Sequence, residues 1–364
     1  MKTQATFKIV IAGGGTGGHL YPGIAIADEF MRQNRKNKIL FLNTGNKLEK
    51  KILSMEQYPS ASIESGKFIN QNIFNKIKTV FIILSSVSIA KKELEKFKAD
   101  AVIGVGGYVG VPVIIAAWLK RIPVFLQEQN SVAGISNKIF SLISKANFVS
   151  FENTKLGFEN KKVFSGNPIR RKILGERKKD NKNKFTVFIT GGSQGARAIN
   201  NAIIDSFDFI DEIDSFLFIH QTGEPQFEGI EKIYKNKGIN SYPAPFFKEI
   251  ADIYKKSDLI VARAGASTLA EISGAGIPAI FIPYPYATHN HQYYNCIEFE
   301  KKGAAIVIEE KNLSGKALGE NISNLYKDKK LLTSMAEKMK EQSMPNAANK
   351  IYETIKGILE KNHV

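Results

Sequence analysis

Short apolar runs alternate along the chain with stretches that carry apolar residues at helical spacing, an order typical of parallel strands joined by helices. A parallel sheet is covered by helices on both faces, so its strands read as nearly continuous apolar runs. The spacing predicts helices at 21–32 and 110–119 in the first half. Strands are expected around them, at 7–12, 39–42, 101–105, 123–126 and 147–150.

The same order starts again after residue 184. Each half opens with a strand, a glycine-rich turn and a helix, which predicts two similar α/β domains, each a doubly wound parallel sheet. Such sheets bind ligands at the carboxyl ends of their strands, so we expect a cleft with the two glycine-rich turns facing each other. The second half is expected to hold strands at 185–190, 216–221, 259–261, 279–282 and 305–308, and helices from about 197 and at 267–275, 289–302, 314–326, 329–341 and 347–361.

A basic, polar stretch separates the two halves. Residues 161–184 hold ten Lys and Arg side chains against Glu176 and Asp180, and the turn Gly166-Asn167-Pro168 lies near the start. This composition predicts a surface linker between the domains, either solvated or attached electrostatically to an anionic surface.

The stretch 73–92 has two interpretations. Residues 80–90 are apolar or small, and lysines flank them on both sides. The uninterrupted run is far shorter than the ~20 residues of a membrane span. The stretch is therefore either a core helix or an interfacial helix, with its apolar face in lipid and its lysines on anionic headgroups.

Charge narrows the choice of partners. The formal net charge is +16 and the pI about 9.5, which indicates a negative partner (nucleic acid, an anionic membrane surface or a phosphorylated substrate) or a generally lysine-rich composition. The absence of a nucleic-acid-binding motif argues against nucleic acid. The single cysteine, Cys296, excludes an internal disulfide framework and fits a reducing compartment. Residues 1–8 carry no signal-peptide pattern.

Three segments that follow strands of the first half carry candidate chemistry. The run 13–19, Gly-Gly-Gly-Thr-Gly-Gly-His, lets amides approach an anion at a helix start, and its spacing is not the dinucleotide-binding fingerprint. Its last residue, His19, is placed to face the bound group. The glycine-rich run 104–110 is either a second side of the same anion site or a tight turn. Residues 127–130, Gln-Glu-Gln-Asn, end a buried strand and are expected to line a cleft.

The second half contains two further anion-type turns. The turn 191–196 brings Ser193 and several amides to a helix start, as phosphate sites do. The run 263–271 passes through glycine into a helix whose first amides point at an anion, with Glu271 in reach of a sugar diol. Alternatively, Glu271 is solvated or is a capping-box partner of the first turn.

Metal chemistry is not expected. His289 and His291 are two residues apart and diverge on a helix, so they make a poor metal pair. The sequence has no cysteine cluster and no His-x-x-x-His, so we expect neither a protein-bound metal nor a cofactor.

Together these segments resemble the bacterial transferases that add N-acetylglucosamine to undecaprenyl-pyrophosphoryl-N-acetylmuramyl-pentapeptide, the MurG family of glycosyltransferase family 28. The similar pieces follow the family's order along almost the whole chain, and in combination they are highly specific. They are 14–19, 106–108, 128–130, 166–170, 191–196, 263–266, Glu271 and His291-Gln292-x-x-Asn295.

The resemblance implies a GT-B fold, two Rossmann-like domains facing a cleft, with the final helix packed onto the N-terminal domain. The implied domains are 1–165 with 346–364, for the acceptor and the membrane, and 166–345, for UDP-GlcNAc. The implied reaction is inverting transfer of GlcNAc from UDP-GlcNAc to the MurNAc 4-hydroxyl of lipid I, giving lipid II for peptidoglycan. The implied location is peripheral, on the cytoplasmic face of the inner membrane. The implied partners are undecaprenyl-linked lipid I, an anionic membrane surface and other cell-wall synthesis proteins.

The resemblance also assigns roles to residues. A base of near-neutral pKa is expected beside the first glycine-rich turn, which makes His19 the candidate catalytic base, with Glu128 as the other candidate. Phe247 stands where the family often has an aliphatic residue, and His291 where some members have glutamine. For the donor, the resemblance implies that uracil is contacted by Arg170 and the backbone near Phe247, and that the ribose hydroxyls are held by Glu271. The diphosphate is expected to be bound by Ser193, Ala266, Ser267, Thr268, Leu269 and Ala270, and the GlcNAc to be contacted by Gln292 and Asn130. The acceptor pyrophosphate is expected to be bound by Thr16, Gly17 and Gly18.

Another GT-B enzyme, such as a glycolipid glycosyltransferase or a UDP-GlcNAc epimerase, is the alternative. His19, the 128–130 segment and the His-Gln-x-x-Asn helix argue against it. A lipid-linked acceptor favours the interfacial interpretation of 73–92.

Overall fold

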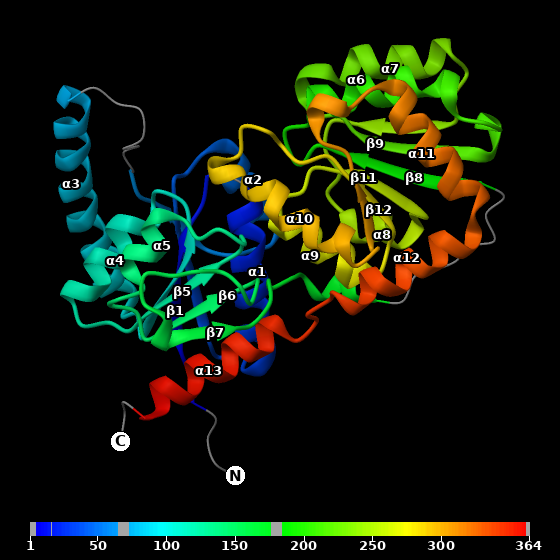
Figure 1. The fold of residues 1–364 in the computed structure, drawn as a ribbon. Coiled ribbons are helices and arrows are strands. Elements are labelled where there is room, and N and C mark those ends of the chain that lie inside the picture. Colours follow the sequence, from blue (N-terminus) through cyan, green and yellow to red (C-terminus); the bar gives the residue numbers. More distant parts are fainter. Residues whose placement is uncertain (1–4, 16, 65–72, 176–183, 362–364) are drawn as a thin grey trace. The chain divides into compact units, whose positions relative to one another are not determined.

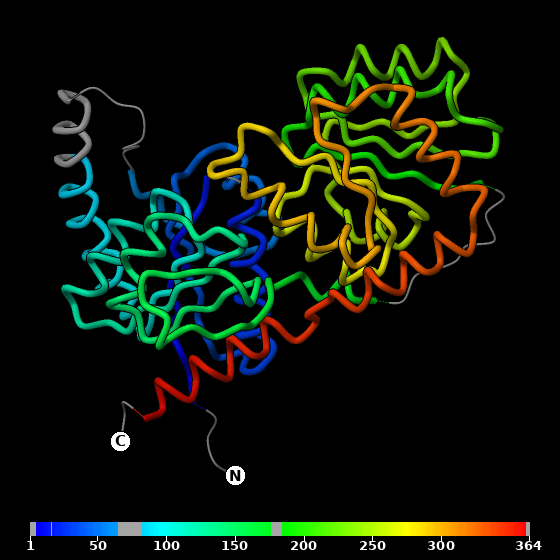
Figure 2. The backbone as a smooth tube through the Cα atoms, in the orientation of Figure 1, coloured from blue at the N-terminus to red at the C-terminus, as the bar shows by residue number. Residues whose placement is uncertain are grey.

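The chain folds into two compact units. The computed structural model describes residues 5–15, 17–64, 73–175 and 184–361, except for the side chains of 73–81 (Figure 1). The first unit comprises Met1–Arg170 and Met344–Val364, and the second Arg171–Ser343. The chain thus leaves the first unit once and returns to it for its last helix, a course that the backbone trace shows (Figure 2).

A parallel sheet forms the centre of the first unit. Its described strands have the order β3-β2-β1-β4-β5-β6-β7, and all their pairings are parallel. The strands are β1 (Lys8–Gly13), β2 (Lys38–Asn43), β3 (Ser60–Ser62), β4 (Ala101–Gly106), β5 (Val124–Glu128), β6 (Ala146–Val149) and β7 (Lys162–Phe164). The helices are α1 (Gly17–Gln33), α2 (Lys47–Met55), α3 (Ile73–Phe97), α4 (Gly110–Leu119), α5 (Ile135–Phe140) and α13 (Ala347–Lys361).

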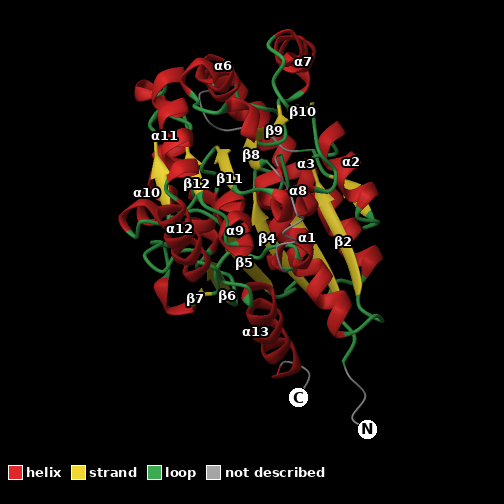
Figure 3. Cartoon of the chain, turned by 90° about the vertical axis from the view of Figure 1, so that its right-hand side faces the viewer, coloured by secondary structure: helices red, strands yellow, loops and turns green. Residues whose placement is uncertain are grey.

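Alternate residues of these strands belong to two apolar cores, because successive side chains point to opposite faces of a sheet. In β1, Ile9 and Ile11 pack with α1 and α13, whereas Val10 and Ala12 pack with α3 and α4. Helices therefore cover both faces (Figure 3). This double cover explains why the strands are apolar on both sides.

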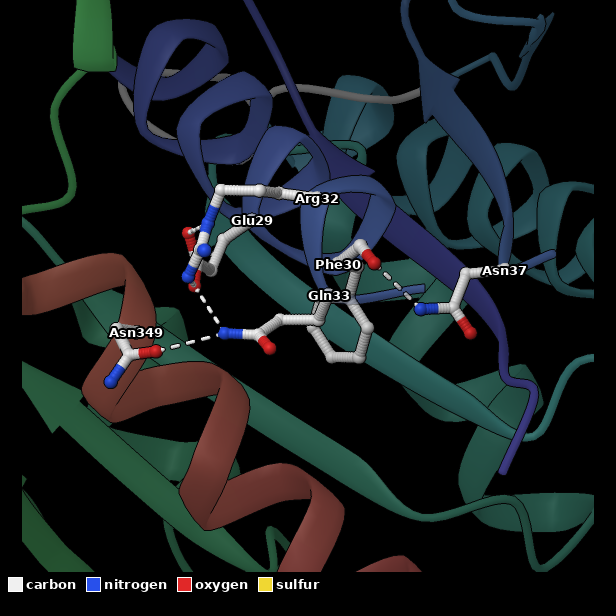
Figure 4. Close-up of polar contacts among 6 residues, drawn as sticks. All are labelled: Glu29, Phe30, Arg32, Gln33, Asn37 and Asn349. Carbon is white, nitrogen blue, oxygen red and sulfur yellow. Dashed lines mark hydrogen bonds and ion pairs between the residues drawn. The ribbon is translucent and has the colours of Figure 1, made fainter. Parts of the chain in front are cut away.

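Helix α13 is fixed to α1 by apolar and polar contacts. Tyr352 is fully buried and meets Phe30 edge to face, with ring centroids 5.0 Å apart. Gln33 Nε2 donates to the buried carboxylate of Glu29 over 2.8 Å and to Asn349 Oδ1 of α13 over 3.1 Å (Figure 4). The last helix is thus part of the core of the first unit.

The second unit is also built on a parallel sheet, of order β10-β9-β8-β11-β12-β13. Val187 and Ile189 of β8 lie in a core with α6 and α11, while Phe188 between them meets Tyr254 on the other face. The strands are β8 (Phe185–Thr190), β9 (Phe216–Gln221), β10 (Ser241–Ala244), β11 (Leu259–Ala262), β12 (Ala279–Phe281) and β13 (Ala305–Val307). The helices are α6 (Arg197–Ser206), α7 (Phe227–Asn236), α8 (Ile250–Lys256), α9 (Ala266–Ala275), α10 (His291–Lys301), α11 (Gly315–Lys327) and α12 (Lys329–Glu341).

Each sheet reverses its strand order at a central pair of strands. The reversal lies between β1 and β4 in the first unit and between β8 and β11 in the second. Loops leave the sheet in opposite directions there, and open α/β sheets bind ligands at this place. The glycine-rich turns after β1, β4 and β8, and the run that follows β11, all lie at these two reversals.

The predicted doubly wound parallel sheets are confirmed, and the predicted strands all occur. Over the described residues, none of the helices is both long and apolar enough to cross a bilayer. The elements that the apolar pattern missed are short or polar: α2, β3, α5, β7, α7, α8 and β10.

Three predicted boundaries were wrong. Helix α1 begins at Gly17 rather than near residue 20, because its first turn, Gly-Gly-His, carries no apolar signal. Strand β5 continues through Glu128, since the buried carboxylate of Glu128 accepts hydrogen bonds from the loop that follows the strand. Helix α10 begins at His291, because His289 and Asn290 before it have φ values of 53° and 52°, which a helix does not tolerate.

The stretch 161–184 connects the two units, which divide at Arg170 and Arg171, as the prediction of a linker implied. Its described part is folded, however, and is not the polar surface segment that was predicted. Strand β7 pairs with β6 at the sheet edge, and residues 166–169 are buried. Gly166 has φ +81° and lies against Met344, where a Cβ would overlap with that side chain. A short helical turn, Arg171–Leu174, then opens the second unit. The remainder of the stretch, 176–183, lies outside the described residues.

Candidate active site

Two glycine-rich turns of the first unit interlock at the strand reversal. The N–H of Gly14 faces the carbonyl of Gly106 at 3.4 Å. Gly107 lies so close to Gly14 that a Cβ on it would overlap with the Gly14 carbonyl, and its φ of +84° also disfavours a side chain. The turns after β1 and β4 therefore form one continuous surface.

His19 lies beside this surface, in the first turn of α1. Its Nδ1 is 3.3 Å from Gln129 Oε1, and Gln129 Nε2 donates to the Val105 carbonyl over 2.7 Å. The second bond fixes the orientation of the amide, so Nδ1 of the neutral ring carries the proton. Nε2 is then the proton-accepting atom, as a general base requires. The ring needs glycine at 106, where a Cβ would come within 2.7 Å of Nδ1.

Glu128, the other candidate base, holds a turn together. Its buried Oε1 accepts the N–H of Asn130 over 3.0 Å. Its Oε2 accepts the N–H of Gly134 over 3.0 Å and the side-chain amide of Asn137 over 2.8 Å. Both oxygens are occupied by donors, which favours His19 as the base. The same carboxylate also receives Asn130 Nδ2, at 3.2 Å, and so orients that side chain.

Gln221 joins two loops at the carboxyl edge of the second sheet. At the end of β9, its Nε2 donates to the Gly192 carbonyl over 2.9 Å and lies 3.2 Å from the Thr190 hydroxyl. Its Oε1 accepts the N–H of Phe247 over 3.0 Å. One buried side chain thus holds the turn that contains Ser193 and the segment that contains Phe247. Because the N–H of Phe247 is used here, its backbone offers a ligand the carbonyl.

Helix α9 begins at this edge without a capping side chain. Its N-cap is Gly265, which has no side chain to accept an N–H group of the first turn, and such an N-terminus favours an anion. Glu271 lies further along α9, only 6% exposed, with the Tyr254 hydroxyl 3.3 Å from its Oε2. It is therefore neither solvated nor a capping-box partner. The predicted diphosphate ligands Ala266, Ser267, Thr268, Leu269 and Ala270 open the helix.

Arg263 stabilises the segment that leads to Gln292. Its guanidinium pairs with Glu310 at 2.5 Å and donates to the Pro283 carbonyl over 3.3 Å. Gln292 Oε1 in turn accepts the N–H of Tyr284 over 3.0 Å. These contacts place Gln292 near the end of β12, on the same edge as α9.

The other predicted residues lie in the first unit. The guanidinium of Arg170 stacks over the ring of Tyr21 in α1, 4.0 Å from its centroid, a cation–π geometry. Gly17 and Gly18 open α1, so their amides belong to its first turn. Thr16 lies outside the described residues. In the described part of the chain, no three His, Cys, Asp or Glu side chains gather to hold a metal.

The sequence analysis missed two residues that fix the loops. Gln221 carries the same signal as residues 127–130, a polar side chain at the end of a buried strand, and was detectable in that way. Glu49 accepts the N–H of Gly15 from outside the turn. Its signal was the Asn46-x-x-Glu49 capping box at the start of α2.

Two doubly wound units with anion-type turns at their strand reversals define a protein of the GT-B class. The chain belongs to glycosyltransferase family 28: residues 9–149 match its N-terminal domain and residues 186–351 its C-terminal domain.

Individual relatives agree with this family. A Bacillus pumilus protein named UDP-N-acetylglucosamine--N-acetylmuramyl-(pentapeptide) pyrophosphoryl-undecaprenol N-acetylglucosamine transferase is 40% identical over 361 residues, 96% of this chain and 99% of the relative. The crystal structure of Acinetobacter baumannii MurG covers 98% of this chain and 99% of its own, with TM-score 0.74 and 29% identity. A putative UDP-N-acetylglucosamine 2-epimerase from Listeria monocytogenes covers 98% of both chains with TM-score 0.68, but at 11% identity this likeness shows the fold alone.

Proposed function

We propose that the chain is an inverting transferase that moves GlcNAc from UDP-GlcNAc to the MurNAc 4-hydroxyl of undecaprenyl-pyrophosphoryl-MurNAc-pentapeptide. The observation that carries the proposal is the relative at 40% identity over nearly the whole of both chains, which bears the name of such a transferase. The likeness to MurG supports it. The product is lipid II, the lipid-linked disaccharide of peptidoglycan synthesis.

In this proposal the second unit binds the donor. The first-turn amides of α9 and the turn at Ser193 hold the diphosphate, since both are sets of backbone donors at helix starts. Glu271 accepts the ribose hydroxyls, the carbonyl of Phe247 faces the uracil, and Gln292 contacts the GlcNAc. The positive end of α9 stabilises the negative charge that builds on UDP as it leaves.

The first unit binds the acceptor and activates it. The amides of Gly17 and Gly18 hold the acceptor pyrophosphate at the start of α1. His19 Nε2 takes the proton of the MurNAc 4-hydroxyl while that oxygen attacks the anomeric carbon. The new glycosidic C–O bond forms as the bond to the UDP oxygen breaks, and the configuration inverts. The contacts of Asn130 with GlcNAc and of Arg170 with uracil stay predictions.

The lipid-linked acceptor leads us to propose a peripheral membrane location, on the cytoplasmic face of the inner membrane. Exposed apolar side chains gather on α3, α4 and the α5 region, which pack on one shared core of the first unit. Exposed apolar side chains on neighbouring helices, together with basic residues such as Lys91 and Lys92, are typical of membrane contact. The side chains are Leu84, Ile89, Trp118, Leu119, Ile135, Ile139 and Leu142.

A transfer assay tests the reaction and the base together. Wild type and His19→Ala are incubated with UDP-[14C]GlcNAc and a lipid I analogue. We expect a labelled lipid-linked disaccharide from the wild type, and a kcat lower by about 10²- to 10⁴-fold in the variant, with UDP binding unchanged, because general-base catalysis contributes about that much. A variant with normal turnover removes the base role. A wild type that labels a diacylglycerol acceptor, or only epimerises UDP-GlcNAc, contradicts the proposed function.

A further inference from the structure

Glu49 lies buried directly against the first glycine-rich turn. It is 1% exposed, and its Oε1 accepts the N–H of Gly15 over 2.5 Å. Its Oε2 accepts the hydroxyl of Thr44 over 2.6 Å and the N–H of Asn46 over 3.1 Å. The carboxylate is thus satisfied by donors from the turn and from the segment that leads into α2.

This arrangement changes how the turn can bind an anion. N–H groups at a helix start attract anions, but Gly15 has given its N–H to an internal carboxylate. A second negative charge near that carboxylate is also repelled. In the proposed function, the acceptor pyrophosphate is therefore bound without the N–H of Gly15. Gly15 itself serves as a fixed point of the turn.

The turn is held from two sides. On one side Gly14 meets Gly107, and His19 packs against Gly106. On the other side, the Glu49 carboxylate is so close that a Cβ on Gly14 would overlap with it. Gly15, with φ +96°, lies between these supports. Because only a few residues separate Gly15 from His19, a shift at Gly15 moves the amides of the helix start and the imidazole ring.

We propose that Glu49 is a positioning residue for the transfer. By holding the Gly15 N–H, its carboxylate sets the acceptor-binding amides and the ring of His19 in their working positions. The inference rests on the proposed function, and it assigns Glu49 no direct contact with either substrate.

The test compares Glu49→Ala and Glu49→Gln with a control, Asn46→Ala. Asn46 Oδ1 accepts the N–H of Glu49 over 2.9 Å, so the control weakens the same helix cap without touching Gly15. For each protein we measure kcat and KM with the lipid I analogue, the Kd of UDP and the thermal midpoint.

Glu49→Ala is expected to lower kcat by about 10- to 100-fold, since a misplacement of about 1 Å costs about 10²-fold. The Kd of UDP should stay within about 2-fold of wild type, because α9 and its neighbours belong to the other unit. Glu49→Gln keeps an oxygen for Gly15 and should recover most of the loss. Asn46→Ala should lower the thermal midpoint but keep kcat within about 2-fold.

Normal kcat in Glu49→Ala, or an equal loss of kcat in Asn46→Ala, overturns the positioning role while the proposed function stands. A wild type that transfers nothing overturns the proposed function and this inference with it. If Glu49→Ala does not fold, Glu49→Asp decides, because it keeps the charge but draws the carboxylate away from Gly15. Its kcat must then fall at least about 10-fold.

Discussion

Gln221 and Glu49 each hold a glycine-rich turn from outside that turn. Both are almost completely buried, and their polar atoms are hydrogen bonded to backbone groups of the loops. A buried amide or carboxylate is stable only with such partners. The side chain therefore needs the loop for its hydrogen bonds, and the loop needs the side chain to keep its shape. At the scale of the residue, the shape of each anion-type turn depends on a side chain far away in the sequence.

His220, next to Gln221 in β9, is also fully buried, but the polar partners of its ring are side chains. Its Nδ1 lies 3.1 Å from the Tyr234 hydroxyl and its Nε2 3.1 Å from Asn200 Oδ1. Asn200 Nδ2 donates to the Thr222 carbonyl, so Oδ1 is an acceptor and His220 Nε2 carries the proton. Burial lowers the pKa of His220 to about 3, and the ring is neutral in the folded protein.

We expect mild acid to destabilise the second unit through His220. The unfolded chain has a histidine pKa near 6.5, so between pH 6.5 and about 3 it binds one proton more than the folded chain. The free energy of unfolding then falls as the pH falls, by up to about 1.4 kcal/mol per pH unit, and this contribution is fully present above pH 6.5.

Urea denaturation at pH 7.5, 6.5 and 5.5 measures this effect. His220→Gln removes the titrating group and should lose about 1 kcal/mol less than wild type over this range. The control, His289→Gln, changes an exposed histidine of the same unit and should follow the wild type. Parallel pH dependences of His220→Gln and wild type would show that His220 does not cause the effect.

At the scale of the element, the helices and strands that pack their apolar residues into a core are the ones that the sequence pattern predicts well. Helix α4 was predicted at its observed bounds because it packs its apolar residues into a core. Strands β7 and β10 were missed because they are edge strands, which are short and partly exposed. β10 even contains Pro243, a residue that an edge strand accommodates and that argues against a strand in the sequence.

The features of the candidate site also fall into some that the sequence predicts and some that it does not. Ser193, the opening of α9 and residues 127–130 were identifiable as candidates because each follows a predicted buried strand, whose carboxyl end is where open sheets bind ligands. The left-handed backbone at His289 and Asn290 and the ion pair between Arg263 and Glu310 were not predictable. Both depend on tertiary contacts, which local spacing does not record.

Helix α13 returns to the first unit and is held there mainly by apolar packing. We therefore expect Tyr352→Ala to lower the free energy of unfolding by about 3–5 kcal/mol, as truncation of a buried aromatic ring does. Asn349→Ala removes only the hydrogen bond from Gln33 and should cost about 1 kcal/mol. Hydrogen exchange of the α13 amides, read by mass spectrometry, should become much faster in Tyr352→Ala than in Asn349→Ala. Similar protection in the two variants would contradict apolar packing as the dominant anchor.

At the scale of the whole molecule, charge and exposed apolar surface act together. The net charge of +16 attracts the chain to an anionic surface from any orientation. In the proposed membrane location, by contrast, the exposed apolar groups of α3 and α4 determine which face of the first unit enters the interface. Leu84 is 61% and Trp118 55% exposed, and both helices pack on the same core. Lys91 and Lys92 of α3 follow the exposed apolar residues of that helix and supply local positive charge.

We expect the protein to bind vesicles that contain phosphatidylglycerol and to bind pure phosphatidylcholine vesicles much more weakly. Each basic residue at the surface contributes about 1 kcal/mol, and this attraction is screened by salt, so binding should weaken between about 0.05 and 0.5 M KCl.

The double variant Leu84→Glu with Trp118→Glu should bind at least about 10-fold more weakly, because each exposed apolar side chain gains about 1.5 kcal/mol or more on burial in lipid. Leu331→Glu, an exposed leucine of α12 in the second unit, is the matched control and should bind like wild type. Co-sedimentation with sucrose-loaded vesicles measures the partition, and circular dichroism verifies that the variants fold. Equal partition of the double variant and the control would show that this face does not meet the membrane, and would leave the net charge as the cause of binding.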